Sequence, residues 1–109
     1  MKDFERIDDK DARLDEAMAR ITAAACSLPG FLPAGMRRDV FAERPQDEPV
    51  QTYVQKVHAG ALDVSDEDIR ALLEVGYSQD EIFELTVAAA VGAGMKRHEK
   101  AMALLDEDS

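Results

Sequence analysis

The spacing of apolar residues predicts helices along most of the chain. Between Asp8 and Leu28, apolar residues recur every three or four positions, as on one face of an amphipathic helix. The next segment, residues 27–35, contains two prolines and two glycines, which interrupt helical hydrogen bonding. This segment is therefore predicted to be a connector in which Phe31 and Leu32 are buried.

Two shorter helices are predicted next. The first covers residues 36–43, and a polar connector bracketed by Pro45 and Pro49 follows it. Pro49 suits the first turn of the second helix, because its backbone angle is already helical and its missing N–H would have no helical partner there. This helix is predicted to end near residue 60 or 62. Its apolar stripe consists of Val50, Val54, Val57 and Ala61.

The last two helices have clear start signals. Ser65 and Ser78 are each followed three residues later by an acid, Asp68 and Glu81, that can reach back to a free backbone N–H. Gly76 is placed to end the first of these helices in a left-handed backbone conformation.

From residue 78 the apolar pattern continues without a proline to Leu105, which predicts one long helix. Within it, residues 88–94 are almost all small and would let another backbone approach closely. Gly92 and Gly94 each cost about 1 kcal/mol of helix propensity. We therefore expect tight packing or a bend at this point.

These patterns include no convincing strand and no internal repeat. The sequence predicts an all-α fold, a compact bundle of about five helices in a single domain that covers residues 1–109. The first few residues and residues 106–109 are expected to fray.

Charge and hydropathy narrow the range of partners. The chain has 13 basic and 23 acidic residues, a net charge of −10 that repels polyanions, so we do not expect it to bind nucleic acid. No apolar stretch approaches the roughly 18 residues of a membrane span, and the first residues lack the apolar core of a signal peptide. A cytoplasmic protein that does not bind membranes is expected.

Cys26 is the only cysteine, so an intramolecular disulfide is impossible. A redox-active dithiol usually needs a second cysteine three residues later, and Pro29 occupies that position. A small buried sulfur is the favoured interpretation of Cys26. A single reactive thiol is the alternative.

His58 and His98 are the only histidines, and neither has a glutamate three residues before it. The di-iron pairing of helical bundles is therefore missing, and we expect neither a metal site nor a cofactor. His98 shares its spacing with Met95 and Met102, which favours packing at a helix edge. Acid–base catalysis by either histidine is the alternative.

Lys96 and Arg97 lie toward the end of the long helix, where cations face the partial negative charge of a helix C-terminus. Alternatively, they form a pocket for an anion or a substrate carboxylate together with Arg37 and Arg38. Glu81 and Glu84, at the start of the same helix, are assigned to capping.

Two runs, Val64-Ser65-Asp66-Glu67-Asp68-Ile69-Arg70-Ala71-Leu72 and Gly76-Tyr77-Ser78-Gln79-Asp80-Glu81-Ile82-Phe83-Glu84-Leu85, resemble the alkylhydroperoxidase-D-like and carboxymuconolactone-decarboxylase-like families. The resemblance continues through the alanine-rich stretch to residue 97 and covers about half of the chain. It implies an all-helical fold that usually assembles into trimers or hexamers. Redox-active members carry Cys-x-x-Cys followed four residues later by His. Aligned on Cys26, those positions are Pro29 and Pro33, so this dithiol is not expected here.

Three functional hypotheses follow. The leading one is a non-redox, catalytically silent member of this family, an assembly or binding subunit whose small-residue helix packs against other copies or a protein partner. The second is a dithiol-independent enzyme on a small organic acid or lactone, with His58 or His98 as acid–base and Lys96 and Arg97 holding the carboxylate. The third is a redox protein that forms a mixed disulfide through Cys26.

Overall fold

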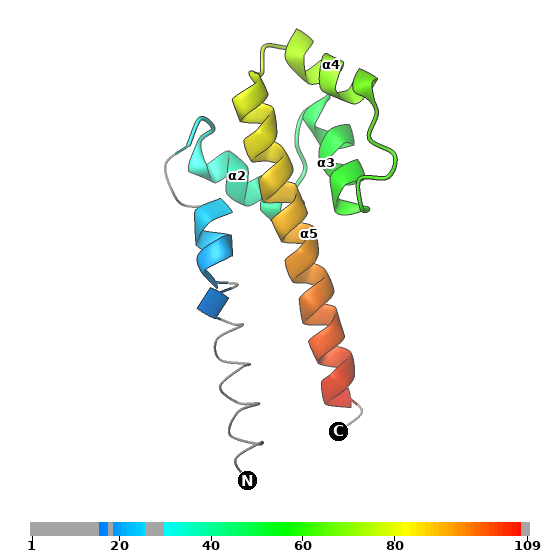
Figure 1. Ribbon diagram of the computed structural model, residues 1–109. Coiled ribbons are helices and arrows are strands. Elements are labelled where there is room, and N and C mark those ends of the chain that lie inside the picture. Colours follow the sequence, from blue (N-terminus) through cyan, green and yellow to red (C-terminus); the bar gives the residue numbers. More distant parts are fainter. Residues whose placement is uncertain (1–15, 18, 26–29, 108–109) are drawn as a thin grey trace.

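The computed structural model describes residues 16–17, 19–25 and 30–107. All regular elements in this part of the chain are helices, as predicted (Figure 1). Residues 19–25 form a helical stretch. The four helices that follow are α2 (Ala34–Phe41), α3 (Val50–His58), α4 (Asp66–Glu74) and α5 (Gln79–Glu107).

The 29-residue helix α5 is the scaffold of the fold. At 1.5 Å per residue it is about 44 Å long. Helices α2, α3 and α4 all contact α5 and gather around its N-terminal half, while its C-terminal half extends away from them (Figure 1). The long helix predicted from residue 78 onward is thus confirmed, and it continues through Glu107, two residues into the segment for which fraying is predicted.

The core lies where these three helices meet the first half of α5. Its largest fully buried side chains are Leu72, Leu85, Val40 and Val54. The last buried residue of α5 is Ala93, so residues 94–107, about 21 Å of helix, contribute no side chain to the core.

The small residues of α5 fall into two sets. Ala88, Ala89, Gly92 and Ala93 are buried, and a Cβ atom at Gly92 would overlap the backbone carbonyl of Phe41 at the end of α2. The close approach that the sequence predicts is therefore made by a helix of the same chain. Ala90 and Gly94 are exposed, and a Cβ atom at Gly94 would have no neighbour within 4 Å.

The helix starts follow the predicted capping pattern. The Ser65 N–H donates to Oδ2 of Asp68 (2.8 Å) at the start of α4. At the start of α5, the Ser78 N–H donates to Oε1 of Glu81 (2.9 Å), and the Glu81 N–H donates to Oγ of Ser78 (3.1 Å). In both cases the acid three residues later accepts the serine N–H, and at α5 the Ser78 hydroxyl also accepts the Glu81 N–H. These bonds satisfy amide groups that have no partner within the helix.

Helices α2, α3 and α4 end in the same way, with two backbone hydrogen bonds that wrap the chain back onto the last turn. This ending needs a residue with positive φ just beyond the helix. Gly60 (φ 113°) and Gly76 (φ 107°) serve α3 and α4, and Gly76 was the predicted position. After α2 the residue is Glu43 (φ 59°), although glycine adopts this conformation more easily.

Three sequence predictions are corrected. Helix α2 begins two residues earlier than predicted, directly after Pro33, and ends at Phe41. Phe31 is 69% exposed instead of buried, while its neighbour Leu32 is buried. Ala61 is exposed and lies outside α3, because the positive φ of Gly60 ends that helix before it.

Candidate functional site

Polar side chains from three elements meet where α2 and α3 end against the middle of α5. Glu43 follows α2, His58 is the last residue of α3, and Lys96 and Arg97 lie on α5. We call these four residues the helix-end cluster. Three of the five residues predicted as candidate site residues, His58, Lys96 and Arg97, are therefore brought together by the fold.

His58 is the buried member of the helix-end cluster, with a side chain only 4% exposed. Its Nε2 lies 2.9 Å from the carbonyl oxygen of Val40. Because a carbonyl oxygen only accepts hydrogen bonds, Nε2 carries a hydrogen and donates it. Its Nδ1 lies 3.8 Å from Oε2 of Glu43. Both ring nitrogens thus face groups of the protein.

Arg97 closes the end of α3. Its Nη2 donates a hydrogen bond to the backbone carbonyl of His58 (3.1 Å). The last carbonyls of a helix lack partners within the helix, so the guanidinium supplies a donor that α3 cannot provide itself.

Lys96 pairs with Glu43, and their charged atoms lie 2.6 Å apart. The hydrogen bond from Lys96 is the largest influence on the Glu43 carboxyl and lowers its pKa. Burial of the carboxyl opposes this, and the charges of His58 and Lys96 add a further lowering of the pKa. The carboxylate form of Glu43 is therefore stabilised in the folded protein.

Lys96 and Arg97 do not act on the end of their own helix. Helix α5 continues to Glu107 and has no basic residue in its last turn. Lys96 and Arg97 instead face the C-terminal ends of α2 and α3, where the same attraction to partial negative charge applies. The predicted attraction of Lys96 and Arg97 to the end of their own helix is therefore wrong, because both side chains bind groups at the ends of other helices.

His98 points to another face of α5. Together with Met95, Met102 and Ala19 it borders a cavity of about 490 Å³ between α5 and the helical stretch 19–25. Adjacent residues of a helix point about 100° apart, so His98 is separated from its neighbour Arg97.

Arg37 and Arg38 have different surroundings from Lys96 and Arg97. Arg37 is buried and lines a cavity of about 340 Å³ beside Phe31 and Phe83. Arg38 is exposed and borders a separate cavity near Thr22. The anion pocket that would combine all four cations is therefore not formed by these side chains.

Cys26 lies outside the described residues, and both interpretations of its thiol stay predictions. In the part of the chain that the structure describes, no three histidine, cysteine, aspartate or glutamate side chains are grouped so that they could hold a metal ion. None of the described helices combines the length and apolar character needed to cross a membrane.

The capping role predicted for Glu84 is wrong, because Glu81 caps the start of α5 and Glu84 binds the connector before α2 instead. Its carboxylate accepts the backbone N–H groups of Phe31 (2.6 Å to Oε2) and Leu32 (3.1 Å to Oε2), and so ties the connector before α2 to α5. A Cβ atom at Gly30 would overlap this carboxylate. The partners are more than 50 residues apart, and no local pattern links an acid in α5 to two amides at that distance.

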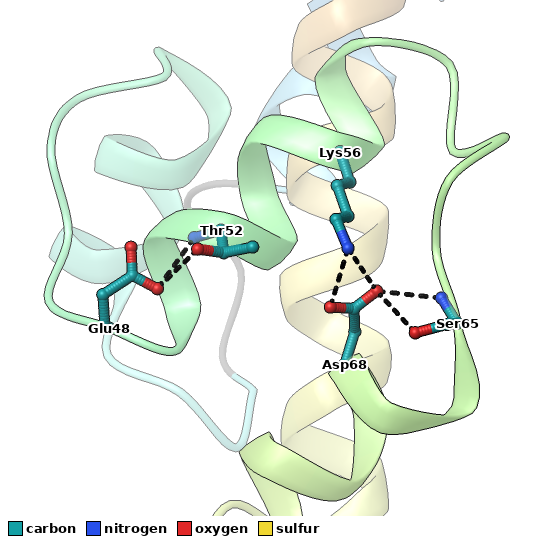
Figure 2. Close-up of polar contacts among 5 residues, drawn as sticks. All are labelled: Glu48, Thr52, Lys56, Ser65 and Asp68. Carbon is teal, nitrogen blue, oxygen red and sulfur yellow. Dashed lines mark hydrogen bonds and ion pairs between the residues drawn. The ribbon is translucent and has the colours of Figure 1, made fainter.

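A further polar group joins α3 to α4 (Figure 2). Nζ of Lys56 donates to both carboxylate oxygens of Asp68, at 3.0 and 2.9 Å, and Asp68 also accepts the Ser65 N–H. The bond from the Ser65 backbone lowers the pKa of Asp68 most, and the bond from Lys56 adds to this lowering. At the start of α3, the Glu48 carboxylate accepts both the N–H and the hydroxyl of Thr52. These contacts fix helix ends.

No family model matches the chain, and no curated protein or solved structure matches it. The resemblance to the alkylhydroperoxidase-D-like and carboxymuconolactone-decarboxylase-like families therefore rests on the sequence pattern and stays a prediction.

Proposed function

We propose that the chain is a catalytically silent, non-redox helical subunit that works by assembling with other copies or by binding a protein partner. The observation that carries this proposal is the state of the helix-end cluster. Its members are hydrogen-bonded or paired to groups that terminate helices, so their chemistry is used to hold the fold together.

An acid–base role would need a proton-transferring atom within hydrogen-bond reach of a substrate. Nε2 of His58 is bonded to the Val40 carbonyl, and little of the ring reaches the surface. A carboxylate-binding role would need donors aimed at a ligand, whereas Lys96 and Arg97 donate to Glu43 and to the His58 carbonyl. These contacts favour a structural role over the enzyme hypothesis.

Large apolar side chains at the surface support a binding role. Phe83 is 68% exposed near the start of α5, and Leu104 and Leu105 are 55% and 62% exposed near its end. Phe31 is exposed as well and borders the same cavity as Phe83. Burial of such side chains against another protein would release about 1.5–3 kcal/mol for each fully covered side chain.

Catalytic silence can be tested with a panel of lactones, small organic acids and peroxides. We expect no turnover above the rate of the uncatalysed reactions. Turnover that disappears in His58→Gln or His98→Gln, while circular dichroism shows an unchanged helical content, would contradict the proposal. His98→Gln also serves as a comparison for His58→Gln, since only His58 belongs to the helix-end cluster.

A further inference from the structure

A row of seven positions runs along the outer side of α5 at alternating spacings of four and three residues, the pattern of a coiled-coil contact row. None of these residues is buried, and all except Val87 are exposed. Six of the seven are apolar or glycine, and the row is about 32 Å long at 1.5 Å per residue. We call it the α5 seam. It consists of Phe83, Val87, Ala90, Gly94, Arg97, Ala101 and Leu104.

Gly94 leaves open space in the α5 seam. A glycine inside a helix costs about 0.5–1 kcal/mol relative to alanine. At Gly92 the fold requires glycine, because a side chain would overlap the Phe41 carbonyl. At Gly94 a Cβ atom would meet nothing within 4 Å, so the described chain gives no reason for the glycine. Another helix lying close against this point would offset its cost.

We infer that the α5 seam binds the α5 seam of a second copy of this chain, in antiparallel orientation. The inference rests on the proposed function and names the partner and the surface for it. A two-fold axis between residues 95 and 96 makes the contact self-complementary, as in most dimers. It sets Arg97 against the partner's Gly94, Ala90 against the partner's Ala101, and Val87 against the partner's Leu104.

Side-chain size and charge select this arrangement. In the antiparallel pair, the aliphatic stem of Arg97 lies opposite the partner's Gly94, while its guanidinium keeps the hydrogen bond to the His58 carbonyl. In a parallel pair, Arg97 would lie beside the partner's Arg97, and two like charges in contact destabilise an interface. The α5 seam contains no acidic residue, so the repulsion expected from a net charge of −10 is not concentrated there.

The surface is tested by light scattering on the purified full chain at micromolar concentration. We expect an even multiple of 12.0 kDa for the unaltered chain, and 12.0 kDa for both Ala90→Leu and Gly94→Leu. Both positions are exposed, so the fold should accept leucine, and circular dichroism verifies this. Ala103→Leu is the matched control, because residue 103 is exposed and points roughly 160° away from Ala101.

The orientation is tested by cysteine pairs in a Cys26→Ser background. The double variant Ala90→Cys, Ala101→Cys should form an intermolecular disulfide under mild oxidation, because these positions face each other in the antiparallel pair. Ala90→Cys alone should form little. Equal cross-linking of the single variant would overturn the antiparallel arrangement.

The failures of the inference and of the proposed function are distinguishable. If the unaltered chain assembles and both leucine variants keep its mass, the α5 seam is wrong and the proposed function stands. If the unaltered chain is a monomer of 12.0 kDa, the inference is overturned, and the proposed function loses its self-assembling form.

Discussion

Glu43 has two opposing effects on stability. Its positive φ is unfavourable for a residue with a Cβ atom by about 1–2 kcal/mol, yet its carboxylate holds Lys96 and lies near His58. A partly exposed ion pair of this kind contributes about 0.2–1 kcal/mol. Glu43 therefore stabilises the contact between α2 and α5, while its own backbone conformation is unfavourable.

Substitutions at Glu43 separate the two effects. Glu43→Ala removes the carboxylate but keeps the strained conformation, and should lower the unfolding free energy by up to about 1 kcal/mol. Glu43→Gly removes the carboxylate and the strain together, and should be more stable than Glu43→Ala by about 1 kcal/mol. Urea unfolding at pH 7 measures both. An alanine variant as stable as the glycine variant would show that the backbone of residue 43 is unstrained.

The pH dependence of the Glu43 contribution follows from its lowered pKa. The folded protein favours the carboxylate, so the contribution is fully present above the ordinary pKa of 4.5 and is lost as the pH falls below this value through the lowered pKa. The stability difference between the unaltered chain and Glu43→Gln should therefore shrink as the pH falls below 4.5. A difference that grew on acidification would contradict the assignment.

At the scale of elements, helix ends organise this fold. Three consecutive helices end with the same backbone turn, and α5 supplies side chains to two of these ends. Arg97 serves α3 directly, while Lys96 serves α2 through Glu43. The middle of α5 therefore contacts the ends of α2 and α3, which terminate just before residues with positive φ, Glu43 and Gly60.

Removing the donor at the end of α3 should destabilise the protein. Arg97→Ala leaves the His58 carbonyl without this partner, and we expect a loss of about 1 kcal/mol of unfolding free energy. Hydrogen exchange should speed up in the last turn of α3. Lys100→Ala removes an exposed cation of the same helix and serves as the control. If both variants lost the same unfolding free energy, the effect would come from the removed positive charge and not from the hydrogen bond to the His58 carbonyl.

Substitution of the two glycines of α5 by alanine should change the stability of the chain in opposite directions. Gly92→Ala places a methyl group against the Phe41 carbonyl and should destabilise the chain by about 1–3 kcal/mol. Gly94→Ala has open space and should stabilise the helix by about 0.5–1 kcal/mol. Both are compared by urea unfolding in the Ala90→Leu background, so that assembly does not contribute. If both substitutions destabilised the chain, Gly94 would not lie in open space, and the division of the small residues of α5 into a buried and an exposed set would be wrong.

The elements that could be predicted depend on local signals. Ser65, Ser78 and Gly76 act on residues within one turn of themselves, so the starts of α4 and α5 and the end of α4 were readable from sequence. The burial of Phe31 was predicted wrongly, because its exposure depends on how the connector is tied to Glu84, 53 residues away.

The candidate site was only partly readable for the same reason. His58, Lys96 and Arg97 were identified by their scarcity and position. Their meeting depends on α2 and α3 ending against α5, and Glu43 was not recognised as their partner. Glu43 pairs with Lys96, 53 residues away, and a single sequence contains no local pattern that identifies so distant an ion pair.

At the scale of the whole molecule, the two halves of α5 differ in their surroundings. The first half of α5 completes the core of a single chain, and its second half carries apolar residues that no described part of the chain buries. The polar groups of the helix-end cluster at the junction bind groups at the ends of α2 and α3. These features support the proposal that the chain is a subunit that works by assembly or binding.

The native mass of the unaltered protein, measured at micromolar concentration with and without a reductant, tests this account most directly. The account predicts the same multiple of 12.0 kDa under both conditions, because assembly through helices needs no disulfide. A monomer of 12.0 kDa would contradict self-assembly. A mass that falls on reduction would contradict a non-redox subunit and assign the central role to Cys26.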